Sequence, residues 1–173
     1  QCIERDNPAC LPGVGYKPSG MDLSYAAPFH IVVGWNVVHH NTLAVDNPIP
    51  CGSHSDGNGI IMDTFYDGAT NKVVYPFQSL VVGNIAYSNG GRGIHVFRAS
   101  NVTVAHNSAY ANGTDRCMNA YALGDLSQQG GSNNVWINNL ALSQLTPANP
   151  SCGRYCGARN APIVAGDGAG IPD

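Results

Sequence analysis

Residues 91–115 read GRGIHVFRASNVTVAHNSAYANGTD, and the pattern of this stretch predicts how the chain folds. It contains three short apolar runs, at Ile94–Phe97, Val102–Val104 and Ser108–Tyr110. The residues between these runs are rich in Asn and Gly, which tolerate the left-handed backbone of a tight corner. Three short strands separated by three corners predict one coil of a solenoid.

Paired asparagines mark the same corner elsewhere in the chain. A second Asn follows five residues after the first in the pairs Asn36/Asn41, Asn84/Asn89 and Asn107/Asn112. The step from Asn84 to Asn107 is 23 residues, and Asn139 repeats the corner less well. Strands that recur at this period favour a solenoid over a β-sandwich, whose Asn-Gly turns would join hairpins. We predict an all-β fold, a right-handed parallel β-helix of about four to five coils. In it, Asn36, Asn84, Asn107 and Asn139 form a ladder.

The whole chain, residues 1–173, is expected to be one domain. We expect an irregular cap over residues 1–19, coils over residues 20–165 and a tail over residues 166–173. Two long loops are expected, over residues 39–58 and 63–78. The expected first strands of successive coils are Gly20–Leu23, Gly59–Met62, Ile94–Phe97, Ala120–Leu123 and Ala161–Ala165. In the sheet that contains Val102, the expected inward residues are Ile31, Val33, Leu80, Val82, Val102, Val104, Val135 and Ile137.

Composition excludes several classes of protein. Charged residues make up 11% of the chain and hydrophobic residues 43%, so the chain is not of the disordered type. The net charge of −3 and the lack of a basic stripe argue against nucleic acid as a partner. No apolar run is long enough for a membrane span. The chain begins Gln1-Cys2, which we interpret as a processed mature protein or a fragment.

Six cysteines in a chain of this length indicate an oxidising, extracellular compartment. Proximity favours Cys2–Cys10 and Cys152–Cys156 as disulfides, which leaves Cys51–Cys117 to tie a long loop to a later coil. None of these spacings is typical of a zinc site. Asn101-Val102-Thr103 and Asn112-Gly113-Thr114 match the glycosylation pattern, although Asn is also expected at these corners.

Two motifs carry a family resemblance. The run from His54 to Asp63, HSDGNGIIMD, is followed by GRGIHVF at residues 91–97 and NVTV at residues 101–104. Together they resemble secreted right-handed parallel β-helix proteins of the pectate-lyase-like superfamily, over roughly residues 28–142. That superfamily contains lyases, hydrolases, epimerases and non-catalytic proteins, so the resemblance bears on the fold more than on the activity.

The resemblance implies a lyase site near the second coil. Lyases of this kind hold Ca²⁺ with aspartates, and a basic side chain removes the proton beside the uronate carboxylate. The candidate calcium ligands are Asp56, Asp63 and Asp67, and the candidate bases are Arg92, Lys72 and His95. Stacking of coils would place Arg92 over Asn58 and His95 over Ile61.

Structural roles for the same residues stay open. Asp56 to Gly59 can be a plain corner, because Asp-Gly and Asn-Gly pairs form turns, and Arg92 and His95 can be solvated surface residues. The pair His39-His40 fits a loop start better than a metal site, since no third ligand is evident.

Three functions are consistent with these observations. The first is an extracellular protein that acts on a polysaccharide, with lyase chemistry on a uronic-acid polymer. The second is a non-catalytic subunit of an extracellular fibre or surface layer, which self-associates through its coil ends. The third is a carbohydrate-binding module that uses the aromatic side chains of Tyr87, Tyr110, Tyr121 and Trp136.

Overall fold

The computed structural model describes residues 28–43, 50, 52–64, 66–67, 73–115, 117–118, 124–142 and 163–165. The described residues form strands, bridges, bends and turns, and no helix. No helix among them could therefore cross a membrane. The expected strand Gly20–Leu23, the cap over residues 1–19 and the tail over residues 166–173 lie outside the described residues.

Twelve strands form three parallel sheets of four strands each. The first sheet has the order β1 (Phe29–Gly34), β6 (Gln78–Val82), β9 (Val102–Ala105) and β12 (Val135–Ile137). The second has β2 (Val37–His39), β7 (Ile85–Tyr87), β10 (Ser108–Tyr110) and β13 (Leu140–Leu142). The third has β3 (Ile60–Asp63), β8 (Ile94–Phe97), β11 (Leu126–Gln129) and β14 (Ile163–Ala165).

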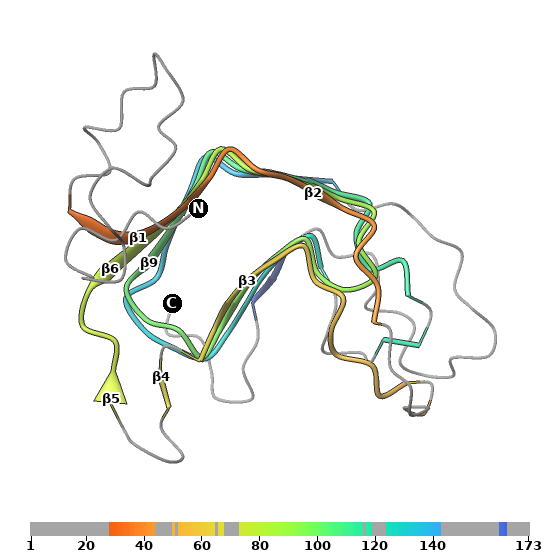
Figure 1. Cartoon of the computed structure of the whole chain (residues 1–173), viewed down its shortest axis with the longest axis horizontal. Helices are drawn as coiled ribbons and strands as arrows, with labels where there is room; N and C mark the ends of the chain where they lie inside the picture. Colours follow the sequence, from red (N-terminus) through yellow and green to blue (C-terminus); the bar gives the residue numbers. More distant parts are fainter. Residues whose placement is uncertain are drawn as a thin grey trace, which may run out of the picture.

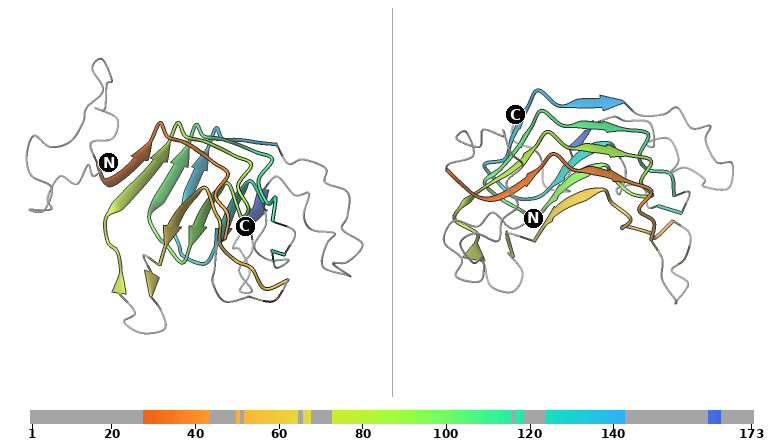
Figure 2. Two further views of the ribbon diagram at one scale, coloured as in Figure 1. Left: turned by 45° about the vertical axis from the view of Figure 1, so that its right-hand side comes forward. Right: turned by 45° about the horizontal axis from the view of Figure 1, so that its top comes forward.

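The chain visits the three sheets in rotation. It passes from the first sheet to the second and then to the third, and it repeats this order four times. In Figure 1 the strands of each sheet lie behind one another, and Figure 2 shows them side by side. All pairings between these strands are parallel, including β6 with β9 and β7 with β10. The hairpin arrangement of a sandwich is therefore excluded for these strands, and the topology is compatible with a parallel β-solenoid.

The three sheets share one core. Its buried members come from the first sheet (Val81, Val102, Val104), the second (Ala86, Ala109) and the third (Ile60, Met62, Ile94, Val96, Leu126). Burial of one such Val, Leu or Ile side chain contributes roughly 1.5–3 kcal/mol. Because each strand is only three to six residues long, no single set of three strands encloses a core, and the sets depend on their neighbours.

The asparagine ladder is confirmed. The Nδ2 of Asn36 donates to Oδ1 of Asn84, Asn84 donates to Asn107, and Asn107 donates to Asn139, each over 2.9 Å. The backbone N–H groups of Asn36, Asn84 and Asn107 donate to the same oxygens over 2.9–3.0 Å. We call this turn between the first and second sheets the first corner.

Half of the expected inward residues of the first sheet are wrong. Val33, Val81, Val104 and Trp136 share one register column, and this column packs into the core. Leu80 and Val82 instead belong to a separate cluster, and Val135 and Ile137 are exposed. Leu80-Val81-Val82 and Val135-Trp136-Ile137 are apolar throughout, so alternation could not decide which face is buried. Counting three residues back from each ladder asparagine would have given the correct face.

The connections between coils also differ from expectation. The third-sheet strand that follows β8 in the sheet is Leu126–Gln129, whereas the expected strand Ala120–Leu123 lies outside the described residues. Leu126-Ser127-Gln128-Gln129 has one apolar residue, so its hydrophobic pattern is weak. The expected loop over residues 63–78 contains an antiparallel pair, β4 (Tyr66–Asp67) with β5 (Val73–Val74). The predicted strand in Ala161–Ala165 is confirmed as β14.

Candidate functional site

A second asparagine ladder borders the candidate site. Asn41 donates through Nδ2 to Oδ1 of Asn89 over 3.0 Å, and Asn89 donates to Asn112 over 2.8 Å. Asn112 then donates to Oδ1 of Asp125 over 2.7 Å. We call this turn between the second and third sheets the second corner. The second ladder fixes the backbone of the connections that lead into β3 and β8, the strands that carry Asp63 and His95.

His95 lies on the outer face of the third sheet. In the register, Ile94 stands between Ile60 and Leu126 in the core column, so the neighbouring residues Ile61, His95 and Ser127 face outward. The expected stacking of His95 over Ile61 is therefore confirmed. Ile61 is 38% exposed, whereas His95 is 1% exposed and Ser127 is 3% exposed. His95 is therefore buried although its position in the register faces outward.

The imidazole of His95 is held in its neutral form. Its Nδ1 lies 2.8 Å from Ser127 Oγ and 3.2 Å from the Ser127 carbonyl oxygen. Its Nε2 is buried and has no hydrogen-bond partner among the described residues. Burial and, to a smaller extent, the positive charge of Arg92 lower the pKa of His95 to about 3, although the hydrogen bond to the Ser127 carbonyl partly opposes this.

Arg92 enters the site from the connection between β7 and β8. Its backbone N–H donates to Oδ1 of Asn58 over 2.8 Å, as the stacking of coils predicts. Its side chain is 5% exposed. Burial lowers the pKa of Arg92 to about 10, while the charge of Asp56 acts in the opposite direction. The structure therefore brings Asp56, Arg92 and His95 together, with a cation that is still charged at neutral pH beside a neutral imidazole.

Glycines on either side of Arg92 make this approach possible. A Cβ at Gly93 would lie 2.5 Å from the Asp125 carbonyl oxygen and 2.6 Å from Asn112 Nδ2. A Cβ at Gly91 would lie 2.6 Å from Asn58 Oδ1. Close packing therefore requires glycine at positions 91 and 93, whatever the role of Arg92.

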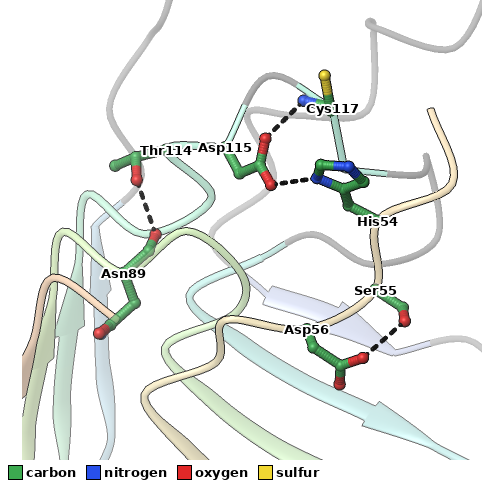
Figure 3. Close-up of polar contacts among 7 residues, drawn as sticks. All are labelled: His54, Ser55, Asp56, Asn89, Thr114, Asp115 and Cys117. Atoms are coloured by element: carbon green, nitrogen blue, oxygen red, sulfur yellow. Dashed lines mark hydrogen bonds and ion pairs between the residues drawn. The ribbon is translucent and has the colours of Figure 1, made fainter. Parts of the chain in front are cut away.

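Of the three aspartates of the expected calcium site, the structure describes the side chains of Asp56 and Asp63. Asp56 precedes β3, is exposed, and accepts a hydrogen bond from Ser55 Oγ over 3.0 Å (Figure 3). Asp63 ends β3 and accepts a hydrogen bond from Thr64. The strand separates the two carboxylates, at about 3.3 Å per residue. Asp67 lies in β4 but its side chain is outside the described part, as is Lys72 altogether.

The pair His54 and Asp115 was missed by sequence reasoning. His54 Nδ1 lies 2.6 Å from Asp115 Oδ2, and Asp115 Oδ1 accepts the backbone N–H of Cys117 over 2.8 Å (Figure 3). The backbone N–H groups of Gly52 and His54 both donate to the Cys117 carbonyl, over 2.8 and 3.2 Å. The predicted Cys51–Cys117 disulfide was a signal for this contact, because it would bring the same two segments together.

Cysteine chemistry limits what the His54–Asp115 pair can hold. The ligand atoms of His54, Asp115 and Cys117 lie within 4.8 Å of one another, as in a metal site. Cys117 is, however, disulfide-bonded, and a metal ligand has to be a free thiolate. Two ligands then remain, so we assign no metal to this group. Cys51 lies outside the described residues, as do Cys2, Cys10, Cys152 and Cys156, and the predicted pairings stay predictions.

The described aromatic residues of the possible carbohydrate-binding module contact other side chains. Tyr87 and Tyr110 stack on each other with centroids 5.1 Å apart and planes at 3°, so one face of each ring is occupied. Trp136 packs against the core and donates through Nε1 to Gln128 Oε1 over 2.8 Å. Tyr121 lies outside the described residues.

The two expected glycosylation asparagines use their side-chain amides within the structure. Asn112 donates to the Ala86 carbonyl as well as to Asp125, so a glycan on its Nδ2 would break the second ladder. Asn101 donates to the Tyr75 carbonyl over 3.2 Å.

No protein-family model, curated protein or solved structure matches the chain. The resemblance to the pectate-lyase-like superfamily therefore stays a prediction.

Proposed function

We propose that the described strands form a right-handed parallel β-helix in an extracellular protein that acts on a polysaccharide. The rotation of the chain through three parallel sheets around one core supports the helix. Crossovers between parallel strands of one sheet are right-handed in about 98% of cases, which supports the hand. The cysteine content supports an extracellular location.

One observation supports activity on a uronic-acid polymer: the gathering of Asp56, Arg92 and His95. A uronate carries a carboxylate on the carbon that loses its proton in a β-elimination. When the proton on the carbon beside that carboxylate is removed, negative charge develops on the carboxylate. A positive charge beside it stabilises that state more than the ground state.

The lowered pKa of Arg92 also makes it the candidate base. A normal arginine holds its proton too tightly for this role, whereas burial brings the pKa of Arg92 to about 10. In the elimination, a neutral guanidine would take the proton and become a guanidinium, whose positive charge then lies beside the uronate carboxylate. The bond to the leaving sugar oxygen would break, that oxygen would take a proton from water, and a carbon–carbon double bond would form. Arg92 is nearly buried, so the residues that cover it must open before a polymer can reach it.

Calcium has no step in this proposal. Asp56 precedes β3 and Asp63 ends it, and calcium binding by these aspartates stays a prediction. A chelator arm in the assay tests calcium directly.

The test is the release of unsaturated sugar ends, measured by ultraviolet absorbance on polygalacturonate, alginate and glucuronan. Activity should rise from neutral pH towards pH 10, because the neutral fraction of Arg92 rises as the pH approaches its pKa. Arg92→Lys should change the pH profile, and Arg92→Gln should abolish activity, while the first-corner control His106→Gln should leave it unchanged. Absence of absorbance on all three polymers, or full activity in Arg92→Gln, would refute the proposal.

A structural subunit is the second candidate, because one observation favours it. The last set of strands exposes four large apolar side chains: Val135 and Ile137 from β12, and Leu140 (64% exposed) and Leu142 (67%) from β13. Asn139, at the end of the first ladder, also has no further ladder asparagine to donate to among the described residues. Sedimentation over a range of concentrations tests this function: an assembly that the pair Leu140→Lys and Leu142→Lys disperses would support it, and a monomer at all concentrations would exclude it.

A further inference from the structure

The first ladder has a direction along the stack of coils. In every step the backbone N–H and the Nδ2 of one asparagine donate to Oδ1 of the asparagine in the next coil, from Asn36 through Asn84 and Asn107 to Asn139. The Nδ2 of the last three also donates to a carbonyl of the preceding coil. An asparagine inside the stack therefore accepts from one neighbouring coil and donates to the other.

The two ends of this ladder are left with opposite groups. We call the end with β1 and β2 the head and the end with β12 and β13 the tail. At the tail, Nδ2 of Asn139 donates to the Val104 carbonyl over 2.8 Å, but its backbone N–H and its second Nδ2 hydrogen have no acceptor among the described residues. At the head, Oδ1 of the exposed Asn36 accepts no hydrogen bond from the described residues. The tail therefore offers the donors that the head acceptor fits.

The backbone beside the ladder is complementary in the same way. Inside the stack, the N–H of the residue after each ladder asparagine donates to the carbonyl of the asparagine in the preceding coil. These bonds run from Ile85 to Asn36, from Ser108 to Asn84 and from Leu140 to Asn107, each over 2.8 Å. The N–H of Val37 at the head and the carbonyl of Asn139 at the tail have no such partner among the described residues, because β2 and β13 are edge strands.

The apolar core is also open at the head and the tail. In the middle coils, the core columns of the first two sheets are 0% exposed, at Val81, Val104, Ala86 and Ala109. The end members of the same columns are only partly buried: Val33 and Val38 at the head, and Trp136 and Ala141 at the tail. Figure 2 shows β1 and β12 at opposite ends of the stack. At the third sheet, Ile60 and Met62 are already buried, so the open part of the head belongs to the first two sheets.

We propose that a second copy of this chain adds head to tail, so that the first ladder and the first two sheets continue from one copy into the next. Asn139 of one copy donates to Oδ1 of Asn36 in the next copy, and the N–H of Val37 in that next copy donates to the Asn139 carbonyl. Strands β12 and β13 then pair in parallel with β1 and β2 of the next copy, which covers the open core.

The product is an open chain of copies. Because head and tail differ, each added copy leaves one end of each kind, so the contact does not close into a dimer. This inference rests on the structural-subunit function, whose partner and contact surface it names. It is independent of the proposed action on polysaccharide.

Asn139→Asp closes the tail. Aspartate keeps the Oδ1 acceptor that Asn107 uses, and the second ladder already has an aspartate in this role, where Asp125 accepts from an asparagine. The substitution removes Nδ2 and puts an oxygen opposite Oδ1 of Asn36. Asn138→Asp is the matched control, because it adds the same charge at the exposed neighbouring residue.

Val37→Pro closes the head. It removes the N–H that would donate to the next copy, and proline is tolerated at this position because Val37 is the first residue of an edge strand. Val37→Ile is the matched control, because it keeps the N–H and an apolar side chain. Circular dichroism checks that each variant keeps its strands and unfolds cooperatively.

Sedimentation velocity over a range of concentrations measures the assembly. The wild type and both controls should form species larger than dimers, whereas Asn139→Asp and Val37→Pro alone should each associate about tenfold or more weakly. An equimolar mixture of these two variants should form dimers and nothing larger, because one open head meets one open tail. If one of them does not fold, the other is mixed with the wild type and should shorten its assemblies.

Three results would overturn the head-to-tail contact. Wild-type association in both end variants would place the contact on another surface and leave the structural-subunit function standing. Dimers of Val37→Pro alone would show that two like ends meet. A wild type that stays monomeric at all concentrations would overturn the head-to-tail contact and the structural-subunit function together.

Discussion

The two corners that flank the second sheet carry the same kind of ladder but differ in the length of their connections. At the first corner the strands are always joined by two residues, Trp35-Asn36, Gly83-Asn84, His106-Asn107 and Asn138-Asn139. At the second corner the connections range from residues 88–93 to residues 40–59 and 143–162. One corner is therefore constant, and the other accepts insertions of very different length.

The ladders explain why this difference is tolerated. In each ladder an asparagine side chain bonds the asparagine of the next repeat and also a backbone carbonyl of the previous one. These bonds fix the backbone at the corner itself, and of the residues further along the connections the second ladder uses Asp125. Variation therefore collects beyond the second corner, and the candidate residues Asp56 and Arg92 also lie in its connections.

Insertion of Gly-Gly gives the largest expected contrast between the corners. Between His106 and Asn107, it would displace Asn107 from both Asn84 and Asn139, and we expect loss of cooperative unfolding. Between the exposed residues Gly52 and Ser53, in a second-corner connection, the same insertion should lower Tm by only a few degrees, because loop length costs little. Thermal unfolding followed by circular dichroism compares the two, and equal effects would contradict the difference between the corners.

Removal of one asparagine side chain from each ladder tests whether the two ladders contribute equally to the free energy of unfolding. Asn107→Ala leaves the N–H groups of Asn84 and the carbonyl of Val81 without partners in a buried site. At about 1–3 kcal/mol for each unsatisfied group, we expect a loss of about 4 kcal/mol. Asn112→Ala removes the corresponding bonds of the second ladder and should cost a similar amount. Urea unfolding measures both, and a negligible cost for Asn112→Ala would show that the second corner is held by something else.

The histidines beside the two corners predict a difference in pH dependence. Burial lowers the pKa of His95 to about 3, below the value of about 6.5 expected in the unfolded chain. Its contribution to stability is complete above pH 6.5. Below that pH, the imidazole is protonated in the unfolded chain but not in the folded protein. The free energy of unfolding therefore falls by about 1.4 kcal/mol per pH unit down to about pH 3.

Urea unfolding between pH 7 and pH 4.5 measures this effect. His95→Gln should reduce the change in the free energy of unfolding by about 2–3 kcal/mol over that range. Identical slopes in wild type and His95→Gln would mean that His95 is accessible to protons in the folded protein.

Asp125→Asn gives the smallest expected effect. Asp125 is buried and accepts both the backbone N–H and the Nδ2 of Asn112 through one oxygen. Asparagine keeps an acceptor but removes the charge, and hydrogen bonds to charged groups are stronger by about 1 kcal/mol. A loss of about 1 kcal/mol in urea unfolding is expected, and a gain would indicate that the ladder prefers asparagine at its last position as well.

The ladder could be predicted from the sequence because asparagine recurs at each corner, where its side chain bonds the asparagine of the next repeat. The sequence also predicted the stacking of Arg92 over Asn58 and His95 over Ile61, since both arise from the repeat. It could not predict that His95 is buried, because the repeat places His95 on the outer face of the third sheet, where Ile61 is exposed. His54 and Asp115 were missed for a similar reason: 61 residues separate them, and they meet through irregular connections.

Native-state hydrogen exchange compares the backbone amides of the two corners with those of the second-corner connections. If the ladders fix both corners, the corner amides exchange only when the whole protein unfolds, whereas the connections open locally. The backbone amides of Asn84 and Asn107 at the first corner, and of Asn89 at the second, donate to ladder oxygens. We predict that all three exchange only through global unfolding, with the same free energy, whereas the amides of Gly52 and Ser53 exchange through local opening. Fast exchange of Asn89 together with Gly52, while Asn84 and Asn107 stay protected, would contradict the account.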